Sequence, residues 1–168
     1  KTGLKKAFAK YGDEIESIGI DTWGVDFGLL DKDGKLISTP VCYRDDRTKG
    51  MLELAFQKLP KEEFFQHAAN QFMEINTAFQ LLSSVSELES AEKLLFMPDL
   101  FNYFLTGKCY NEFTISSTSQ LMNSLTHQWD DVIFDRLGLP KHLMQEIIYP
   151  GTVIGRLADE LAEEVGGN

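Results

Sequence analysis

The stretch that most constrains the fold is Ser17–Asp31, which reads SIGIDTWGVDFGLLD. Its two apolar runs each have the length of a buried β-strand, and Asp21-Thr22-Trp23-Gly24 lies between them. Polar groups at the end of a buried strand need hydrogen-bond partners, and a glycine lets a ligand come close to the backbone. The stretch is therefore either a corner beside a binding site or a β-bulge between two strands, with Trp23 as part of the core.

The pattern on either side of this stretch predicts an α/β fold. Strands are expected over 15–21 and 25–30, and the Asp-Gly pair at 33–34 favours a hairpin turn because it tolerates positive φ. Most of the remaining chain has apolar residues at helical spacing. The expected helices cover 3–12, 51–59, a segment from 60, a segment from 77, 91–96, 99–105, 114–120, 129–137, 141–146 and 157–165.

A second polar stretch, Tyr43–Thr48 (YRDDRT), follows a short extended segment. Its acidic and basic residues can form a network of mutual salt bridges that leads into a helix. In the alternative interpretation, Tyr43 and Arg44 face a pocket while Asp45 and Arg47 hold the loop. The sequence leaves both interpretations open.

Composition excludes several classes of function. A net charge of −10 over 168 residues argues against a nucleic-acid binder or a protein of anionic membrane surfaces. The two cysteines have no metal-type spacing, and no apolar run reaches the roughly 20 residues needed to cross a bilayer. We expect one domain of a cytoplasmic protein with reduced thiols. The helical pattern beginning beside Lys1 and the turn-like Gly-Gly-Asn end lead us to expect an internal piece of a longer chain.

No common catalytic motif is present. The sequence contains no GxxxxGK[ST], GxGxxG or HExxH motif, and its three histidines are far apart. Adjacent carboxylates such as Asp130-Asp131 cannot both face one site in a regular element, and Asp130 is expected to cap the helix that follows. The residues alone therefore give an α/β domain with two candidate pocket segments but do not name a reaction.

Taken together, several segments resemble the FGGY family of carbohydrate kinases and occur in the family's order. They are SIGIDTWGVDFGLLDKDG (17–34), YRDDRT (43–48), INTAFQLL (75–82), MPDLFNYFLTG (97–107), STSQL (117–121), WDD with LGLP (129–140) and PGTVIG (150–155). The resemblance implies a ribonuclease H-like α/β domain with inserted helices, of the type found in actin, hexokinase and Hsp70. Residues 1–168 would form most of the N-terminal, sugar-binding domain, without its first strands.

The resemblance also implies the reaction, which is transfer of the γ-phosphoryl group of ATP to a sugar hydroxyl with Mg²⁺. The family's catalytic aspartate is expected beyond Asn168, so no residue here is named as catalytic, cofactor-binding or metal-binding. Asp21 and Asp26 are expected to support the corner and not to act as the base. We expect the isolated chain to be inactive.

The narrowest matches, IDTWGVDF and YRDDRT, imply a sugar kinase that converts L-rhamnulose to L-rhamnulose 1-phosphate. The implied substrate-binding residues are Trp23, Gly24, Val25 and Tyr43, with Asn76 as a weaker candidate that could instead cap a helix. The indole of Trp23 suits the methyl-bearing face of a 6-deoxy ketose. The alternatives are an FGGY kinase for fuculose or xylulose, and a non-catalytic carbohydrate-binding domain of the same fold.

Overall fold

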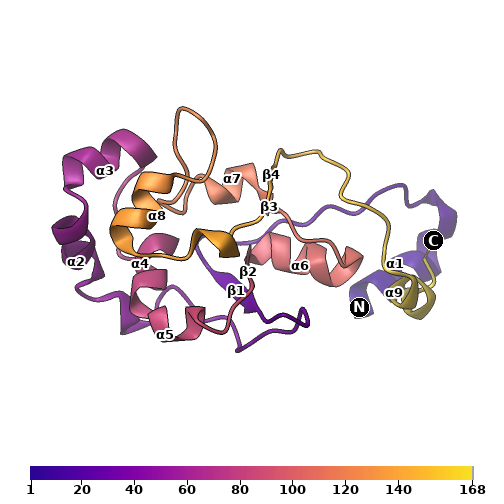
Figure 1. The fold of residues 1–168 in the computed structure, drawn as a ribbon. Coiled ribbons are helices and arrows are strands. Elements are labelled where there is room, and N and C mark those ends of the chain that lie inside the picture. Colours follow the sequence, from indigo (N-terminus) through magenta and orange to yellow (C-terminus); the bar gives the residue numbers. More distant parts are fainter. Residues whose placement is uncertain (168) are drawn as a thin grey trace.

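The computed structural model describes residues 1–167, arranged as an elongated body (Figure 1). Two small sheets and α6 occupy the middle, and a group of helices that includes α2, α3, α4, α5 and α8 lies at one end. The first and last helices, α1 and α9, lie together at the other end, where Lys1 and Lys5 both form ion pairs with Glu164. The chain thus leaves this end after α1 and returns to it in α9.

The first sheet pairs β1 (Phe27–Leu30) antiparallel with β2 (Lys93–Phe96), with Phe27 opposite Phe96 and Leu30 opposite Lys93. The predicted helix over 91–96 is therefore wrong. A short apolar run such as Lys-Leu-Leu-Phe does not distinguish a strand from a helix by its periodicity. Pairing with β1 decides the outcome, and it buries Leu94, Leu95 and Phe96 completely.

The predicted strand over 15–21 does not form within the described residues. Nothing pairs with this segment, and most of its side chains are at least partly exposed, including Ile18. A strand needs a neighbour for its backbone N–H and C=O groups, whatever its side-chain pattern. The second predicted strand, 25–30, is confirmed over Phe27–Leu30, and its hairpin return is reduced to a single bridge between Leu30 and Leu36.

The helices confirm most of the predicted positions. Their bounds are α1 Thr2–Tyr11, α2 Met51–Lys58, α3 Lys61–Ala68, α4 Thr77–Ser83, α5 Val85–Leu88, α6 Met97–Thr106, α7 Phe113–Ser116, α8 Asp131–Leu137 and α9 Asp159–Val165. Single 3-10 turns cover η1 Gly12–Glu14, η2 Asp46–Thr48 and η3 Lys141–Leu143. The predicted cap is also confirmed, since the Asp130 carboxylate accepts a hydrogen bond from the Ile133 amide.

Two helices are much shorter than predicted. After α7, the hydroxyls of Thr118 and Ser119 bond to the carbonyls three residues earlier, and Gln120 has a φ of 66°. Such local bonds compete with a continuing helix. The helix predicted over 141–146 ends after η3, because the chain then enters β4 (Ile147–Ile148), which pairs parallel with β3 (Asn111–Glu112).

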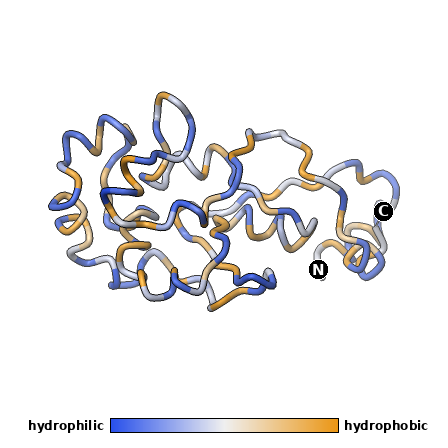
Figure 2. Tube along the Cα trace, viewed as in Figure 1, coloured by the Kyte–Doolittle hydropathy of each residue, from blue (hydrophilic) through white to orange (hydrophobic). Residues whose placement is uncertain are grey.

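The main core lies where α2, α3, α4 and α8 meet the first sheet. Its largest fully buried side chains are Phe64, Phe79, Phe96 and Phe134. Hydrophilic residues follow the outward turns of the helices and the loops (Figure 2). Helix α4 is buried along almost its whole length, so its polar side chains Thr77 and Gln80 lie inside the molecule. Buried polar side chains of this kind need partners, and those partners lie at the corner described below.

The hairpin turn at Gly34 is closed by a contact from α6. Gly34 has a φ of 76°, and its carbonyl accepts a hydrogen bond of 2.9 Å from the Tyr103 hydroxyl. A Cβ atom at this position would lie 2.3 Å from that hydroxyl oxygen. The turn therefore needs glycine for two reasons, its backbone conformation and the space occupied by Tyr103.

We expect Gly34→Ala to lower the free energy of unfolding more than Gly50→Ala does. Gly50 also has a positive φ, of 78°, but a Cβ there would meet nothing within 4 Å. Both variants add backbone strain, whereas only Gly34→Ala adds overpacking, which costs about 1–3 kcal/mol. Urea unfolding followed by circular dichroism measures the difference. Equal losses in the two variants would show that Tyr103 does not restrict this turn.

A buried carboxyl group, Asp99, lies in the first turn of α6. It is 4% exposed and accepts hydrogen bonds from the Asn111 side chain and the Glu112 amide. Burial raises the pKa of Asp99 to about 6, and the two hydrogen bonds oppose that rise only in part. Asp99 therefore binds its proton more tightly in the folded protein than in the unfolded chain, where the pKa of aspartate is about 3.9.

This raised pKa gives the stability a specific pH dependence. As pH rises from about 4 to about 6, the unfolded chain releases the proton first, so the free energy of unfolding falls by roughly 2–3 kcal/mol at most and then levels off. We expect Asp99→Asn to remove this fall, as measured by urea midpoints across that range. The control Asp33→Asn, on an exposed turn, leaves Asp99 in place and should keep it. An unchanged pH profile in Asp99→Asn would contradict the assignment.

Candidate functional site

The corner between the 15–21 segment and β1 is a tight turn at Val25. Val25 has a φ of 66°, and the Asp26 amide donates to the Gly24 carbonyl across it at 2.9 Å. A three-residue turn with positive φ at its centre is rare, and for a β-branched residue the backbone strain is of the order of 1–3 kcal/mol. Because strained backbone persists only where surrounding contacts hold it, this turn is a candidate functional position.

The side chains at the corner point in different directions. Asp26 is 2% exposed and accepts a 2.8 Å hydrogen bond from the Trp23 indole N–H. Trp23 itself is 51% exposed, so the interpretation of Trp23 as part of the core is wrong. Val25 is buried, and its carbonyl accepts hydrogen bonds from Thr77 and Gln80. The corner thus presents an indole to the surface while its carboxylate and carbonyl are engaged internally.

A cavity of about 360 Å³ lies directly beside this corner. Its volume falls within the range that small-molecule sites occupy in proteins. The cavity brings together residues from the two polar stretches singled out in the sequence. Trp23 and Asp26 come from the first, Tyr43 and Arg44 come from the second, and Pro40 and Cys42 come from the extended segment that leads into the second. These two segments, which are far apart in the sequence, therefore form the two walls of one site.

The second wall is organised mainly by short-range bonds. The Arg44 Nε donates to the Tyr43 hydroxyl at 3.2 Å, and the guanidinium lies 5.5 Å from the centre of the Tyr43 ring. The Asp45 carboxylate accepts from the Arg47 amide and so caps η2. The Arg47 side chain donates to Gln80 and Ser84. This arrangement fits the pocket interpretation of the stretch.

The salt-bridge interpretation of the same stretch is wrong for most of its charges. The one ion pair recorded there in the described part of the chain joins Asp46 to Lys49. Both side chains are largely exposed, and such pairs contribute little to stability. The loop is held by the cap at Asp45 and by the bonds of Arg47 to α4.

The four predicted substrate residues do not all reach the cavity. Trp23 and Tyr43 line it, whereas Gly24 and Val25 are not among its lining residues. Gly24 has room, since a Cβ there would meet only the Ile115 side chain at 3.8 Å. Asn76, the weaker candidate, is 1% exposed, and its side chain bonds to the Met73 amide and the Thr118 carbonyl. It neither lines the cavity nor caps α4 with its side chain.

Sequence reasoning missed the residues behind the corner. Thr77 and Gln80 belong to the segment INTAFQLL (75–82), but the sequence assigned neither of them a role at the site. One signal was available: Gln80 lies between Phe79 and Leu81, in a run whose other members, Ala78 and Leu82, are also apolar. A polar side chain at such a position needs a buried partner, but the identity of that partner depends on the packing of α4 against the corner.

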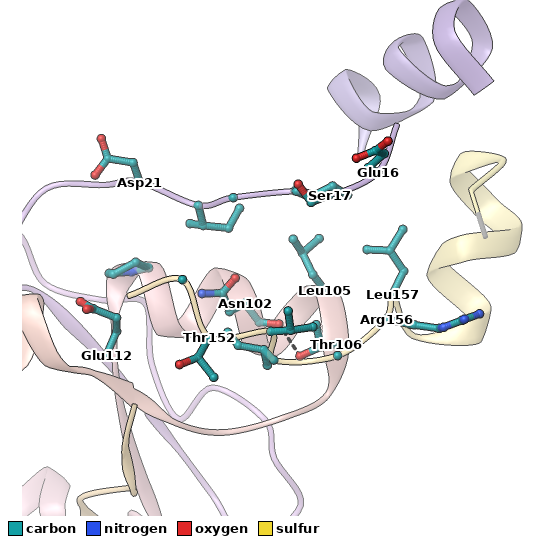
Figure 3. A pocket seen from close by; sticks show the side chains of 18 of the residues that line it. Glu16, Ser17, Asp21, Asn102, Leu105, Thr106, Glu112, Thr152, Arg156 and Leu157 are labelled. Carbon is teal, nitrogen blue, oxygen red and sulfur yellow. Dashed lines mark hydrogen bonds between the residues drawn. The ribbon is translucent and has the colours of Figure 1, made fainter. Parts of the chain in front are cut away.

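A larger cleft of about 1020 Å³ separates the 12–22 segment from α6 and from residues 148–157 (Figure 3). Leu105 of α6 and Leu157 extend from one side toward the unpaired segment, which carries Glu16, Ser17 and Asp21 on the other. Glu112 lies at one end, and its Oε1 is buried without a hydrogen-bond partner among the described residues. The cleft mixes apolar side chains with unpaired backbone, which is unlike a formed ligand site.

Within residues 1–167, no group of three or more His, Cys, Asp or Glu side chains could hold a metal ion. In the same range, no helix has both the length and the apolar character that a membrane span requires.

Comparison with known proteins identifies the family. Residues 4–168 match the N-terminal domain of the FGGY family of carbohydrate kinases. The chain belongs to this family. It is 42% identical to a rhamnulokinase of Bacteroides thetaiotaomicron over 165 residues, covering 96% of this chain and 34% of that protein. It is 41% identical to a rhamnulokinase of Halalkalibacterium halodurans over 170 residues, covering 99% of this chain and 36% of that protein.

Solved structures confirm the predicted fold class. A gluconate kinase from Lactobacillus acidophilus matches with a TM-score of 0.88 at 18% identity, covering 98% of this chain and 34% of that one. A Plasmodium falciparum glycerol kinase with ADP matches with a TM-score of 0.81 at 17% identity, covering 96% and 35%. At these identities the likeness shows the fold of the FGGY sugar kinases alone. The chain spans about a third of the length of the relatives it matches.

Proposed function

We propose that this chain is most of the N-terminal, sugar-binding domain of a longer ATP-dependent kinase, which converts L-rhamnulose to L-rhamnulose 1-phosphate. The observation that carries the proposal is the similarity, over nearly the whole chain, to proteins named rhamnulokinase. We also propose that the complete enzyme acts in the cytoplasm and that strands preceding residue 1 pair with the 15–21 segment along the larger cleft. The unpaired state of that segment supports this last point.

The cavity beside Trp23 is the proposed sugar site. Its exposed indole and the Tyr43 ring supply apolar surface that suits the methyl-bearing face of a 6-deoxy ketose. The guanidinium of Arg44 can donate hydrogen bonds to sugar hydroxyls from the second wall. Gly24 and Val25 take part through the backbone: both belong to the tight turn that sets the direction of Trp23.

The part of this chain in the reaction is to bind and orient the sugar. ATP with Mg²⁺ supplies the phosphoryl group in the complete enzyme, and the residues that hold them and the catalytic base are proposed to lie outside residues 1–168. Asp26 is unsuited to be that base, because it is 2% exposed and its Oδ2 already accepts the Trp23 N–H. A general base must reach the hydroxyl proton that it removes.

A substrate panel on the full-length protein tests the proposed reaction. We expect ATP-dependent phosphorylation of L-rhamnulose with a higher kcat/KM than that of xylulose or fuculose. Equal or faster turnover of xylulose would assign the protein to another substrate within the family. A full-length protein that binds L-rhamnulose but phosphorylates no sugar would indicate a non-catalytic carbohydrate-binding protein.

Gly24→Leu tests the position of the sugar. A leucine would project toward the Ile115 side chain and disturb the turn that carries Trp23, so we expect the KM for L-rhamnulose to rise by about tenfold or more, with little change in the KM for ATP. The fold should remain intact because a Cβ at Gly24 makes only an ordinary contact. The matched control Gly3→Leu adds the same side chain in α1, where a Cβ meets nothing within 4 Å. If both variants keep the parent KM, Gly24 does not border the sugar.

A further inference from the structure

The carbonyl of Val25 is held by two buried donors from α4. The Thr77 hydroxyl donates to it at 2.8 Å and the Gln80 side-chain amide at 3.1 Å. Both side chains are fully buried, so these bonds are shielded from water. A strained turn whose carbonyl is fixed in this way cannot return to an ordinary negative φ without breaking both bonds.

Gln80 is also bonded to the loop that follows the second wall of the cavity. Its side-chain oxygen accepts a 2.6 Å hydrogen bond from the Arg47 guanidinium, while its Nε2 also donates to the Ile75 carbonyl at 2.9 Å. The same Nε2 lies 3.5 Å from the Asp26 carboxylate, whose other oxygen binds Trp23. One amide therefore touches the supports of both walls.

We propose that Gln80, assisted by Thr77, is a positioning residue that sets the geometry of the sugar cavity. Through Val25 and Asp26 it fixes the turn that carries Trp23, and through Arg47 it fixes the segment that carries Tyr43 and Arg44. Gln80 is too deeply buried to touch the sugar, so it acts through these neighbours. This inference rests on the proposed function of the cavity as a sugar site.

The chemistry of the site requires an amide at this position. The nitrogen must donate to two carbonyls and face a carboxylate, while the oxygen must accept from a guanidinium. A glutamate would keep the contact with Arg47 but would direct a negative oxygen at the Val25 and Ile75 carbonyls and at Asp26. A methionine would fill the same volume, so core packing alone does not require glutamine.

The experiment uses the full-length kinase and separates sugar binding from stability. We expect Gln80→Met and Gln80→Glu each to raise the KM for L-rhamnulose by about tenfold or more, because methionine loses the bonds that orient both walls and glutamate loses those that hold the Val25 turn. The KM for ATP should stay within about twofold of the parent value. Thr77→Val removes one of the two bonds to Val25 and should raise the sugar KM by a smaller factor.

Gln120→Met is the matched control. Gln120 is 1% exposed and donates to the carbonyls of Asn70 and Gln71, so its replacement also removes bonds from a buried amide. Both Gln→Met variants should lower the melting temperature, but the control should keep the sugar KM within about twofold. This difference distinguishes positioning of the site from a general loss of stability.

The outcomes that would overturn the inference are defined for each variant. If Gln80→Met keeps the parental sugar KM, or if Gln120→Met raises it equally, Gln80 is a structural residue only. If neither Gln80 variant folds, Thr77→Val decides, and an unchanged sugar KM there overturns the inference. If the parent enzyme phosphorylates a different sugar, the KM comparison is made with that sugar. An error in the proposed substrate is then distinguishable from an error in the proposed role of Gln80.

Discussion

The two buried hydrogen bonds to the Val25 carbonyl are the interaction on which the site depends. A β-branched residue at positive φ is unfavourable by itself and persists only where the surroundings specify it. Thr77 and Gln80 provide that specification from α4, which is buried along almost its whole length. The antiparallel pairing of β1 with β2 then holds the residues that follow the turn. In this part of the molecule, the side chains that pack in the core therefore also fix the geometry of the site.

The polar interior of α4 explains how two distant segments form one cavity. Trp23 and Tyr43 lie on different segments, and neither is bonded to the other in the described structure. Each is instead linked to Gln80, the first through Asp26 and Val25 and the second through the loop that Arg47 anchors. A buried amide has both a donor and an acceptor, so it can bind a carbonyl on one side and a guanidinium on the other. A purely apolar helix could pack against both segments but could not fix their orientation.

Features set by local chemistry were predictable, and features set by distant partners were not. Asp130 was predicted as a cap because the residue type and the following helix suffice. The predictions of a helix over 91–96 and of a strand over 15–21 were wrong, because strand formation depends on a neighbour elsewhere in the chain. The polar stretches at 21–26 and 43–47 were found from composition. Their joint cavity, and the position of Gln80 behind it, required the packing of α4.

The sharing of Gln80 by both walls has a consequence for how this family can diversify. The spacing between Trp23 and Tyr43 depends on a residue that no ligand contacts, so selectivity need not change only at the surface of the cavity. Substitutions in the hidden face of α4 can shift both walls together, whereas a substitution in one wall leaves the other in place. Under the role proposed for Gln80, a substitution at position 80 would alter the cavity without changing any residue that lines it.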